Sequence, residues 1–351
     1  MLKSVGIGSV LMILVVALGV HATFTSQLAM GVDRPPVPWR LLVVALGLPL
    51  SLLIHEGGHW IAGTVLGQRC RRFVVWPLDF RRDGGRWGVR PARRGGLVDL
   101  VPSTFERFRF QRIVIVIAGP IASTAGAAAL TLLSRQTRDP VPFWFLSATV
   151  LWLVIGAGNL LPFAIGSIWS DGYNLWHALR GGEVFDRVQR DLLTPASHAT
   201  PLRPKAWPAD LLARLEQVQT DSANRRFQCY LAYVRHMDSG DPDSARPYLH
   251  DLASERSADD PPEYALESAW FAAIQERQPE TARKWLALDT REVDGEPWVR
   301  PRAEAALDLA EGRPAEARKR IETALAALSA APPSGAHEYE AVLLREMLLR
   351  S

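Results

Sequence analysis

The chain has 351 residues, of which 48% are hydrophobic and 22% are charged, and its formal net charge is +3. This composition excludes a disordered chain and a collagen-like repeat. The two cysteines, Cys70 and Cys229, exclude a disulfide framework and a CxxC metal pair. Apolar residues are concentrated in the first half and acidic residues in the second, so the sequence predicts two unlike parts.

Four apolar stretches have about the length of transmembrane helices, and they cover residues 5–20, 41–66, 113–133 and 143–161. A helix of about 20 mainly apolar residues crosses the roughly 30 Å hydrocarbon core of a bilayer. The first stretch has an alternative interpretation as a secretory signal, because Lys3 precedes it. Either interpretation predicts an integral, multi-pass membrane protein.

The orientation follows from basic residues between the second and third stretches. Lys and Arg near helix ends are retained on the cytoplasmic side. The arginines of this loop are Arg69, Arg71, Arg72, Arg81, Arg82, Arg86, Arg90, Arg93 and Arg94. The loop and everything after Asp171 are therefore predicted to be cytoplasmic. Nucleic-acid binding would need aromatic residues interleaved on an exposed surface, so we interpret the arginines as anchors and predict no nucleic-acid partner.

The arginine-rich loop also has a strand pattern. Residues 73–80 are typical of a strand, Asp83-Gly84-Gly85 of a turn, and residues 86–90 of a return strand. Pro77 favours an edge strand or a bulge, because proline has no N–H to donate. The sequence therefore predicts a small cytoplasmic β-hairpin.

The second apolar stretch contains the sequence His55-Glu56-Gly57-Gly58-His59. Ionisable groups within a membrane helix cost about 2.5–3.5 kcal/mol each on insertion scales, so they indicate a function. The i, i+4 spacing places His55 and His59 on one helix face, where both can bind one Zn²⁺. Glu56 lies beside them and can take a proton from a water on the metal. In the alternative interpretation, two structural histidines pair with Glu56 at a helix interface.

A zinc site of this kind needs a third protein ligand, for which Asp171 is the candidate. Pro162 ends the fourth helix, and Gly166 and Gly172 allow the backbone to fold back towards His59. An Asp-Gly pair alone is also typical of a simple turn.

These motifs together resemble one known family. The sequence His55-Glu56-Gly57-Gly58-His59, with Asn159, Pro162 and Asp171-Gly172 near the end of a later apolar stretch, resembles the site-2 protease family of zinc intramembrane metalloproteases. Ala118-Gly119-Pro120 resembles the Gly-Pro step of the middle core helix of that family.

The resemblance implies a role for each matching residue. His55, His59 and Asp171 would bind zinc, and Glu56 would act first as general base and then as general acid. Asn159 would hydrogen-bond to the substrate backbone or to the developing oxyanion. The β-hairpin corresponds to the region where such proteases add the substrate as an extended strand.

The sequence departs from the family pattern at two places. The interval between Asn159 and Asp171 is a few residues longer than in the compact form of the family, because residues 166–170 are inserted. Ser123 stands where relatives often carry Asn. No PDZ-like insertion separates the core helices.

The second half of the chain has a different organisation. Pro195, Pro201, Pro204 and Pro208 predict a linker, after which three similar segments carry Pro242, Pro279 and Pro314 at intervals of 37 and 35 residues. Each proline is expected at the start of a helix. Helix–turn–helix units of this period resemble tetratricopeptide repeats, with an end helix near residues 339–349; a plain helical bundle is the alternative.

The sequence thus predicts a mainly α chain. Residues 1–185 form a membrane-embedded metalloprotease domain with about four transmembrane helices and the small hairpin, residues 186–215 a linker, and residues 216–351 a cytoplasmic helical repeat domain. The resemblance implies zinc-dependent hydrolysis of peptide bonds in membrane-anchored proteins of a bacterial-type cell membrane. The repeat domain is predicted to bind a cytoplasmic protein partner or the cytoplasmic tail of a substrate.

Two other functions remain open from the sequence. The chain could be a protease-inactive membrane adaptor that acts through its repeats, although the complete HExxH motif and the Asp-Gly pair argue against this. A metal transporter with an intramembrane histidine pair is the third hypothesis. Transporters usually have more polar residues within the membrane and an internal repeat symmetry, and neither is evident here.

Overall fold

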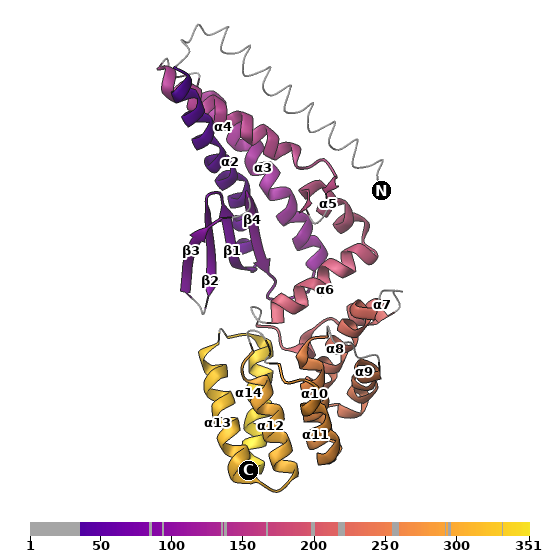
Figure 1. Cartoon of the computed structure of the whole chain (residues 1–351). Coiled ribbons are helices and arrows are strands. Elements are labelled where there is room, and N and C mark those ends of the chain that lie inside the picture. Colours follow the sequence, from indigo (N-terminus) through magenta and orange to yellow (C-terminus); the bar gives the residue numbers. More distant parts are fainter. Residues whose placement is uncertain are drawn as a thin grey trace. The chain divides into compact units, whose positions relative to one another are not determined.

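The structure is a computed structural model, shown in Figure 1. It describes residues 36–351 except 84–85, 93–94, 135, 137–138, 166–167, 198–200, 217–221, 255–259, 292, 294–295 and 332. The first predicted apolar stretch, residues 5–20, lies outside the described residues. The chain divides into two compact units, an N-terminal unit, Met1–Phe185, and a C-terminal unit, Asp186–Ser351. The prediction of a mainly α fold is confirmed.

Three long helices form the body of the N-terminal unit: α2 (Val37–Val65), α3 (Phe108–Ser134) and α4 (Pro140–Gly158). Each of them packs against the other two (Figure 1). Both α2 and α4 carry a proline in their first turn, where a missing N–H breaks no helical hydrogen bond. The second, third and fourth predicted apolar stretches therefore correspond to helices.

Among the described residues, α3 is the helix that is long and apolar enough to cross a bilayer. Ile121, Leu132 and Leu133 on α3 are each half exposed or more, so this helix presents a large apolar surface outside the protein core. A shorter apolar helical stretch covers Phe145–Gly158. The complete predicted multi-pass topology stays a prediction.

The chain between α2 and α3 forms a four-stranded antiparallel sheet, which is larger than the predicted hairpin. Its strands are β1 (Arg69–Val75), β2 (Leu78–Asp83), β3 (Arg86–Pro91) and β4 (Gly96–Val101), and their order in the sheet is β3-β2-β1-β4.

The predicted single strand over residues 73–80 is wrong, because Trp76 and Pro77 form a turn between β1 and β2. Proline cannot donate to a ladder, so the chain reverses there instead of continuing as one strand. The predicted return strand is confirmed as β3, which pairs with β2. Gly84 and Gly85 of the predicted turn lie outside the described residues.

Part of the arginine run stabilises this sheet. Asp79 on β2 is buried, and its carboxylate accepts hydrogen bonds from Arg72 at 2.7 Å and from Arg81 at 2.9 Å. The two guanidinium groups hold the pKa of Asp79 well below its usual range. Arg71 forms a further ion pair with Asp99 across β1 and β4. These arginines therefore have a structural role in addition to the predicted role as anchors.

After α4 the chain makes a short reversal. It forms a two-stranded hairpin from β5 (Ala164–Ile165) and β6 (Ile168–Trp169) and then enters α5 (Asp171–Arg180). This reversal sets the position of Asp171.

The predicted linker over residues 186–215 is largely helical. It contains most of α6 (Glu183–Ser197), the short 3₁₀ helix η1 (Pro204–Ala206) and nearly all of α7 (Ala209–Glu216). The leucines of α7 are buried, and Asp186 forms an ion pair with Arg214. Pro204 begins η1 and Pro208 directly precedes α7, whereas Pro195 lies in the last turn of α6.

In the rest of the C-terminal unit, the described elements are helices. They are α8 (Ser222–Asp238), α9 (Pro242–Ser254), α10 (Pro262–Ile274), α11 (Pro279–Leu288), α12 (Val299–Ala310), α13 (Pro314–Ala330) and α14 (Gly335–Arg350). As predicted, Pro242, Pro279 and Pro314 each begin a helix. Each of these helices packs on the one before it. The similarity to tetratricopeptide repeats stays a prediction.

Candidate metal centre

Three of the predicted site residues converge in the N-terminal unit. The Nε2 atoms of His55 and His59 lie 3.0 and 3.4 Å from Oδ2 of Asp171. One potential ligand atom from each residue lies within 4.8 Å of the others. The two histidines are 6% and 8% exposed. The structure therefore brings together two imidazoles from α2 and a carboxylate from the start of α5.

The helix α2 positions both histidines on one face. Their i, i+4 spacing stacks them along the helix axis, and their ring centroids lie 5.0 Å apart with the planes at 86°. The second nitrogen of each ring is engaged elsewhere. Nδ1 of His55 lies 2.8 Å from Oγ of Ser123, and Nδ1 of His59 donates to the carbonyl oxygen of Ile115 at 2.6 Å. Both contacts fix the ring orientations from α3.

These contacts provide a test of whether a cation fits. A carbonyl oxygen only accepts, so Nδ1 of His59 carries the proton, and in the neutral ring Nε2 presents a lone pair. That lone pair faces an oxygen of Asp171. Two electron-rich groups at this distance require a proton or a cation between them. Metal-binding histidines commonly donate their other N–H to a carbonyl or a carboxylate, so the arrangement fits a divalent cation such as zinc.

The turn after α4 fixes Asp171. Nδ2 of Asn159 donates to Oδ2 of Asp171 at 2.8 Å, and the backbone N–H of Gly172 donates to the carbonyl of Asn159 at 2.9 Å. A Cβ atom at Gly172 would lie 1.9 Å from the carbonyl oxygen of Leu160, so this approach requires glycine. Ser170 caps α5 by accepting from the N–H of Tyr173.

The longer interval before Asp171 does not displace it. The additional residues contribute to the β5–β6 hairpin, whose Gly166 lies outside the described residues. On the far side of the hairpin, the N–H of Ser170 donates to the carbonyl of Phe163 at 3.0 Å, and Oγ of Ser170 donates to the carbonyl of Leu161 at 2.7 Å. The chain therefore returns to the end of α4 before Asp171.

The structure places Asn159 on Asp171 through the hydrogen bond described above. The resemblance assigned this amide to the substrate or to the oxyanion. The role of this amide towards a substrate stays a prediction.

Glycines from three other elements lie directly against the site. A Cβ atom on Gly119 of α3 would lie 2.3 Å from Nε2 of His59, and one on Gly96 of β4 would lie 2.3 Å from Oε1 of Glu56. A Cβ atom on Gly156 of α4 would lie 3.2 Å from Nδ1 of His55. Glu56 is buried and faces the first residue of β4. The backbones of α3, α4 and β4 therefore form walls of the site.

Sequence reasoning missed most of these wall residues. Ser123 was noted only as a departure from the family pattern, and Gly119 only as part of a Gly-Pro step. Nothing in the sequence distinguishes Gly96 or Gly156 from other glycines. Their roles depend on which backbone segments approach α2.

The two glycines of the HEGGH sequence have different surroundings, and a matched pair of variants tests them. A Cβ atom on Gly58 would lie 2.5 Å from the carbonyl oxygen of Ala118, whereas nothing lies within 4 Å of one on Gly57. Gly58→Ala is expected to push α2 away from α3 and to lower the free energy of unfolding by about 1–3 kcal/mol. Gly57→Ala is expected to leave the free energy of unfolding unchanged or to raise it by up to about 1 kcal/mol, because alanine favours a helix more than glycine does.

Thermal unfolding of the full chain in detergent measures both effects. Equal losses in the two variants would contradict the close packing of α2 on α3 at Gly58.

The comparisons with known proteins support one family assignment for part of this unit. The sequence model of peptidase family M50, the site-2 protease family, matches residues 43–138. The matched segment contains most of α2, the four-stranded sheet and all of α3, and it ends before Asp171. No curated protein and no solved structure matches the chain. The match supports a hydrolase and suggests a membrane-embedded metalloprotease.

Proposed function

We propose that this chain is a zinc-dependent intramembrane endopeptidase that hydrolyses membrane-anchored proteins. The observation that carries the proposal is the convergence of His55, His59 and Asp171, with Glu56 buried beside the two histidines. Two imidazoles and one carboxylate form a common protein ligand set of catalytic zinc, which keeps its fourth position for water or substrate.

Each residue has a distinct task in this proposal. His55, His59 and Asp171 hold the metal, while Ser123 and Asn159 fix the orientation of a histidine and of the carboxylate. Zinc held by these residues would supply a Lewis acid for the scissile carbonyl and would activate the attacking water. Glu56 accepts the proton of the attacking water and then donates it to the leaving amine.

The proposed site lies within the membrane part of the chain. We assign α2, α3 and α4 as membrane-spanning helices, with the arginine-rich sheet and the C-terminal unit on the cytoplasmic side. The family match and the apolar exposed surface of α3 support a membrane location. The orientation rests on the arginines between α2 and α3. The ionisable residues of a His-Glu-His cluster on α2 would be costly at such a depth unless they had a function.

The sheet offers a way to present a substrate. The amides of an intact transmembrane helix are hydrogen-bonded within the helix, so a substrate must unwind locally before hydrolysis. The strand β4 is at one end of the described sheet, and its first residue, Gly96, contacts Glu56. We propose that the unwound segment is held in an extended form next to β4, where its carbonyl groups approach Glu56. The helical C-terminal unit would bind a cytoplasmic protein or a substrate tail.

Metal removal tests the proposal with the full chain in detergent micelles and a panel of labelled single-span peptides. Cleavage is expected with one equivalent of Zn²⁺, and it is expected to fall to background after treatment with 1,10-phenanthroline and to return on zinc addition. Product masses from mass spectrometry identify the cleaved bonds.

Cleavage that is insensitive to the chelator would contradict a metalloprotease. A chain that binds zinc and cleaves no peptide of the panel at any zinc concentration would favour the inactive adaptor.

A further inference from the structure

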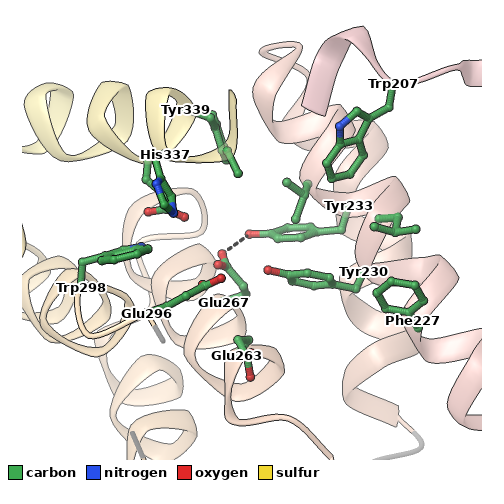
Figure 2. Close-up of a pocket in the computed structure, with 14 residues that line it drawn as sticks. Trp207, Phe227, Tyr230, Tyr233, Glu263, Glu267, Glu296, Trp298, His337 and Tyr339 are labelled. Carbon is green, nitrogen blue, oxygen red and sulfur yellow. Dashed lines mark hydrogen bonds between the residues drawn. The ribbon is translucent and has the colours of Figure 1, made fainter. Parts of the chain in front are cut away.

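A cavity of about 100 Å³ lies within the C-terminal unit, and its lining comes mainly from α8, α10 and α14 (Figure 2). Six aromatic side chains and four carboxylates dominate this lining. The aromatic residues are Trp207, Phe227, Tyr230, Tyr233, Trp298 and Tyr339, and the carboxylates are Glu263, Glu267, Glu296 and Glu340. We call this space the aromatic–acidic cavity. It contains no residue of the metal centre.

The rings and carboxylates face one another across this space. Figure 2 shows the rings of Tyr230 and Tyr233 extending from α8 towards Glu267 on α10, with Trp298 on the opposite side. The hydroxyl of Tyr233 donates to Oε2 of Glu267 at 3.1 Å. Glu263, another residue of the lining, is half-buried.

Two of the lining carboxylates share one buried cation. Arg302 is 1% exposed and forms ion pairs with Glu267 and, at 3.2 Å, with Glu340. One buried cation therefore serves two carboxylates. The second oxygen of Glu340 and Oε2 of Glu263 have no hydrogen-bond partner. Burial raises the pKa of Glu340 to about 7, although Arg302 opposes the shift. The carboxyl group of Glu340 would remain ionised more readily if a second cation lay nearby.

Two buried donors also line the cavity without an acceptor. The indole N–H groups of Trp207 and Trp298 have no hydrogen-bond partner, and these residues are 4% and 2% exposed. A buried donor without a partner costs about 1–3 kcal/mol. Both indoles belong to the lining of the cavity, so a ligand with a hydrogen-bond acceptor beside its charged group can satisfy them.

The size and chemistry of the space restrict what it can hold. Pockets for drug-sized ligands measure roughly 300–1,000 Å³, so this one accommodates a side-chain end and not a larger molecule. Aromatic faces attract ammonium and guanidinium groups, and carboxylates form charge-assisted hydrogen bonds with them. We propose that the aromatic–acidic cavity binds the cationic end of an arginine or lysine side chain of a polypeptide, whose adjacent peptide carbonyl accepts from an indole N–H.

Binding to the full chain in detergent tests this proposal by isothermal titration calorimetry. The probe is N-acetyl-arginine amide, and its matched control is N-acetyl-citrulline amide, which has nearly the same shape but no charge. The arginine compound is expected to bind saturably and at least about tenfold more tightly, because only it carries a positive charge that pairs with the carboxylates. Equal binding of the two compounds, or no binding of either, would overturn the proposal.

Methylguanidinium distinguishes a cationic side chain of a polypeptide from a free organic cation. It carries the charge without a peptide group, so weaker binding than that of N-acetyl-arginine amide supports a polypeptide ligand. Equal or tighter binding of methylguanidinium would overturn the polypeptide assignment in favour of a free organic cation.

Matched variants locate the binding site. Glu263→Gln keeps the side-chain shape and removes one charge from the cavity, so the arginine compound is expected to bind about tenfold more weakly. Glu316→Gln on α13 changes an exposed carboxylate outside the cavity and is expected to leave the affinity unchanged. Unchanged affinity in Glu263→Gln, or equal weakening in both variants, would overturn the assigned site. If Glu263→Gln fails to fold, Tyr230→Leu replaces it with the same expected direction.

Discussion

Glu56→Gln is expected to reduce peptide hydrolysis by at least about 10³-fold while zinc remains bound. Glutamine has nearly the shape of glutamate but cannot accept the proton of the attacking water, and positioned acid–base groups commonly contribute 10²–10⁴-fold. Glu56 is not one of the three residues whose potential ligand atoms converge, so the metal affinity is expected to be retained. Initial rates and the metal content of the same preparation measure both effects.

Glu106→Gln is the matched control for this substitution. Glu106 is an exposed carboxylate of the same unit that precedes α3, and its replacement is expected to leave the rate unchanged. Cleavage by Glu56→Gln at the wild-type rate would contradict the role of Glu56 in hydrolysis and would favour the adaptor hypothesis.

Replacing the residues of the metal centre is expected to give a graded loss of zinc affinity. His59→Ala and Asp171→Ala each remove one of three converging groups and are expected to weaken zinc binding by more than about 100-fold, because metal–ligand bonds supply most of the binding free energy. Ser123→Ala removes only a partner of His55, and such outer contacts are typically worth 10–100-fold. Competition with a zinc-binding dye measures the three affinities.

The relative sizes of the three losses in zinc affinity distinguish a metal ligand from a positioning residue. If His59 and Asp171 were only a structural ion pair, their removal would destabilise the fold without a specific change in zinc binding. An effect of Ser123→Ala as large as that of His59→Ala would contradict the distinction between ligand and positioning residue.

The parts of the site that follow from local spacing are evident in the sequence. The i, i+4 spacing of His55 and His59 predicts that both lie on one helix face, and α2 places them there. Asp171 could be selected only in combination with the HExxH sequence, since an Asp-Gly pair alone is common in turns. Its approach to the histidines depends on the turn after α4, where Gly172 packs against the backbone of Leu160.

The contacts between distant segments could not be predicted from spacing. Ser123 lies 68 residues from His55 in the chain and contacts it only because α3 packs on α2. The apposition of Gly96 and Glu56 requires the fourth strand, which the hairpin prediction did not include.

In the C-terminal unit, too, local features could be predicted from the sequence and contacts between distant segments could not. Pro242 and the two prolines that follow at similar intervals predict helix starts correctly, because proline is tolerated in the first turn of a helix. The aromatic–acidic cavity depends on how α8, α10 and α14 pack, and it could not be inferred from the order of its residues in the chain.

X-ray absorption at the zinc edge of the purified full chain tests the central claim most directly. We expect one zinc per chain with two imidazole nitrogens and carboxylate or water oxygens at about 2.0–2.2 Å, and loss of one imidazole from the spectrum in His59→Ala. A chain that retains no zinc at micromolar concentrations of the metal, or a bound zinc whose coordination is the same in wild type and His59→Ala, would contradict a metal centre built on α2 and Asp171.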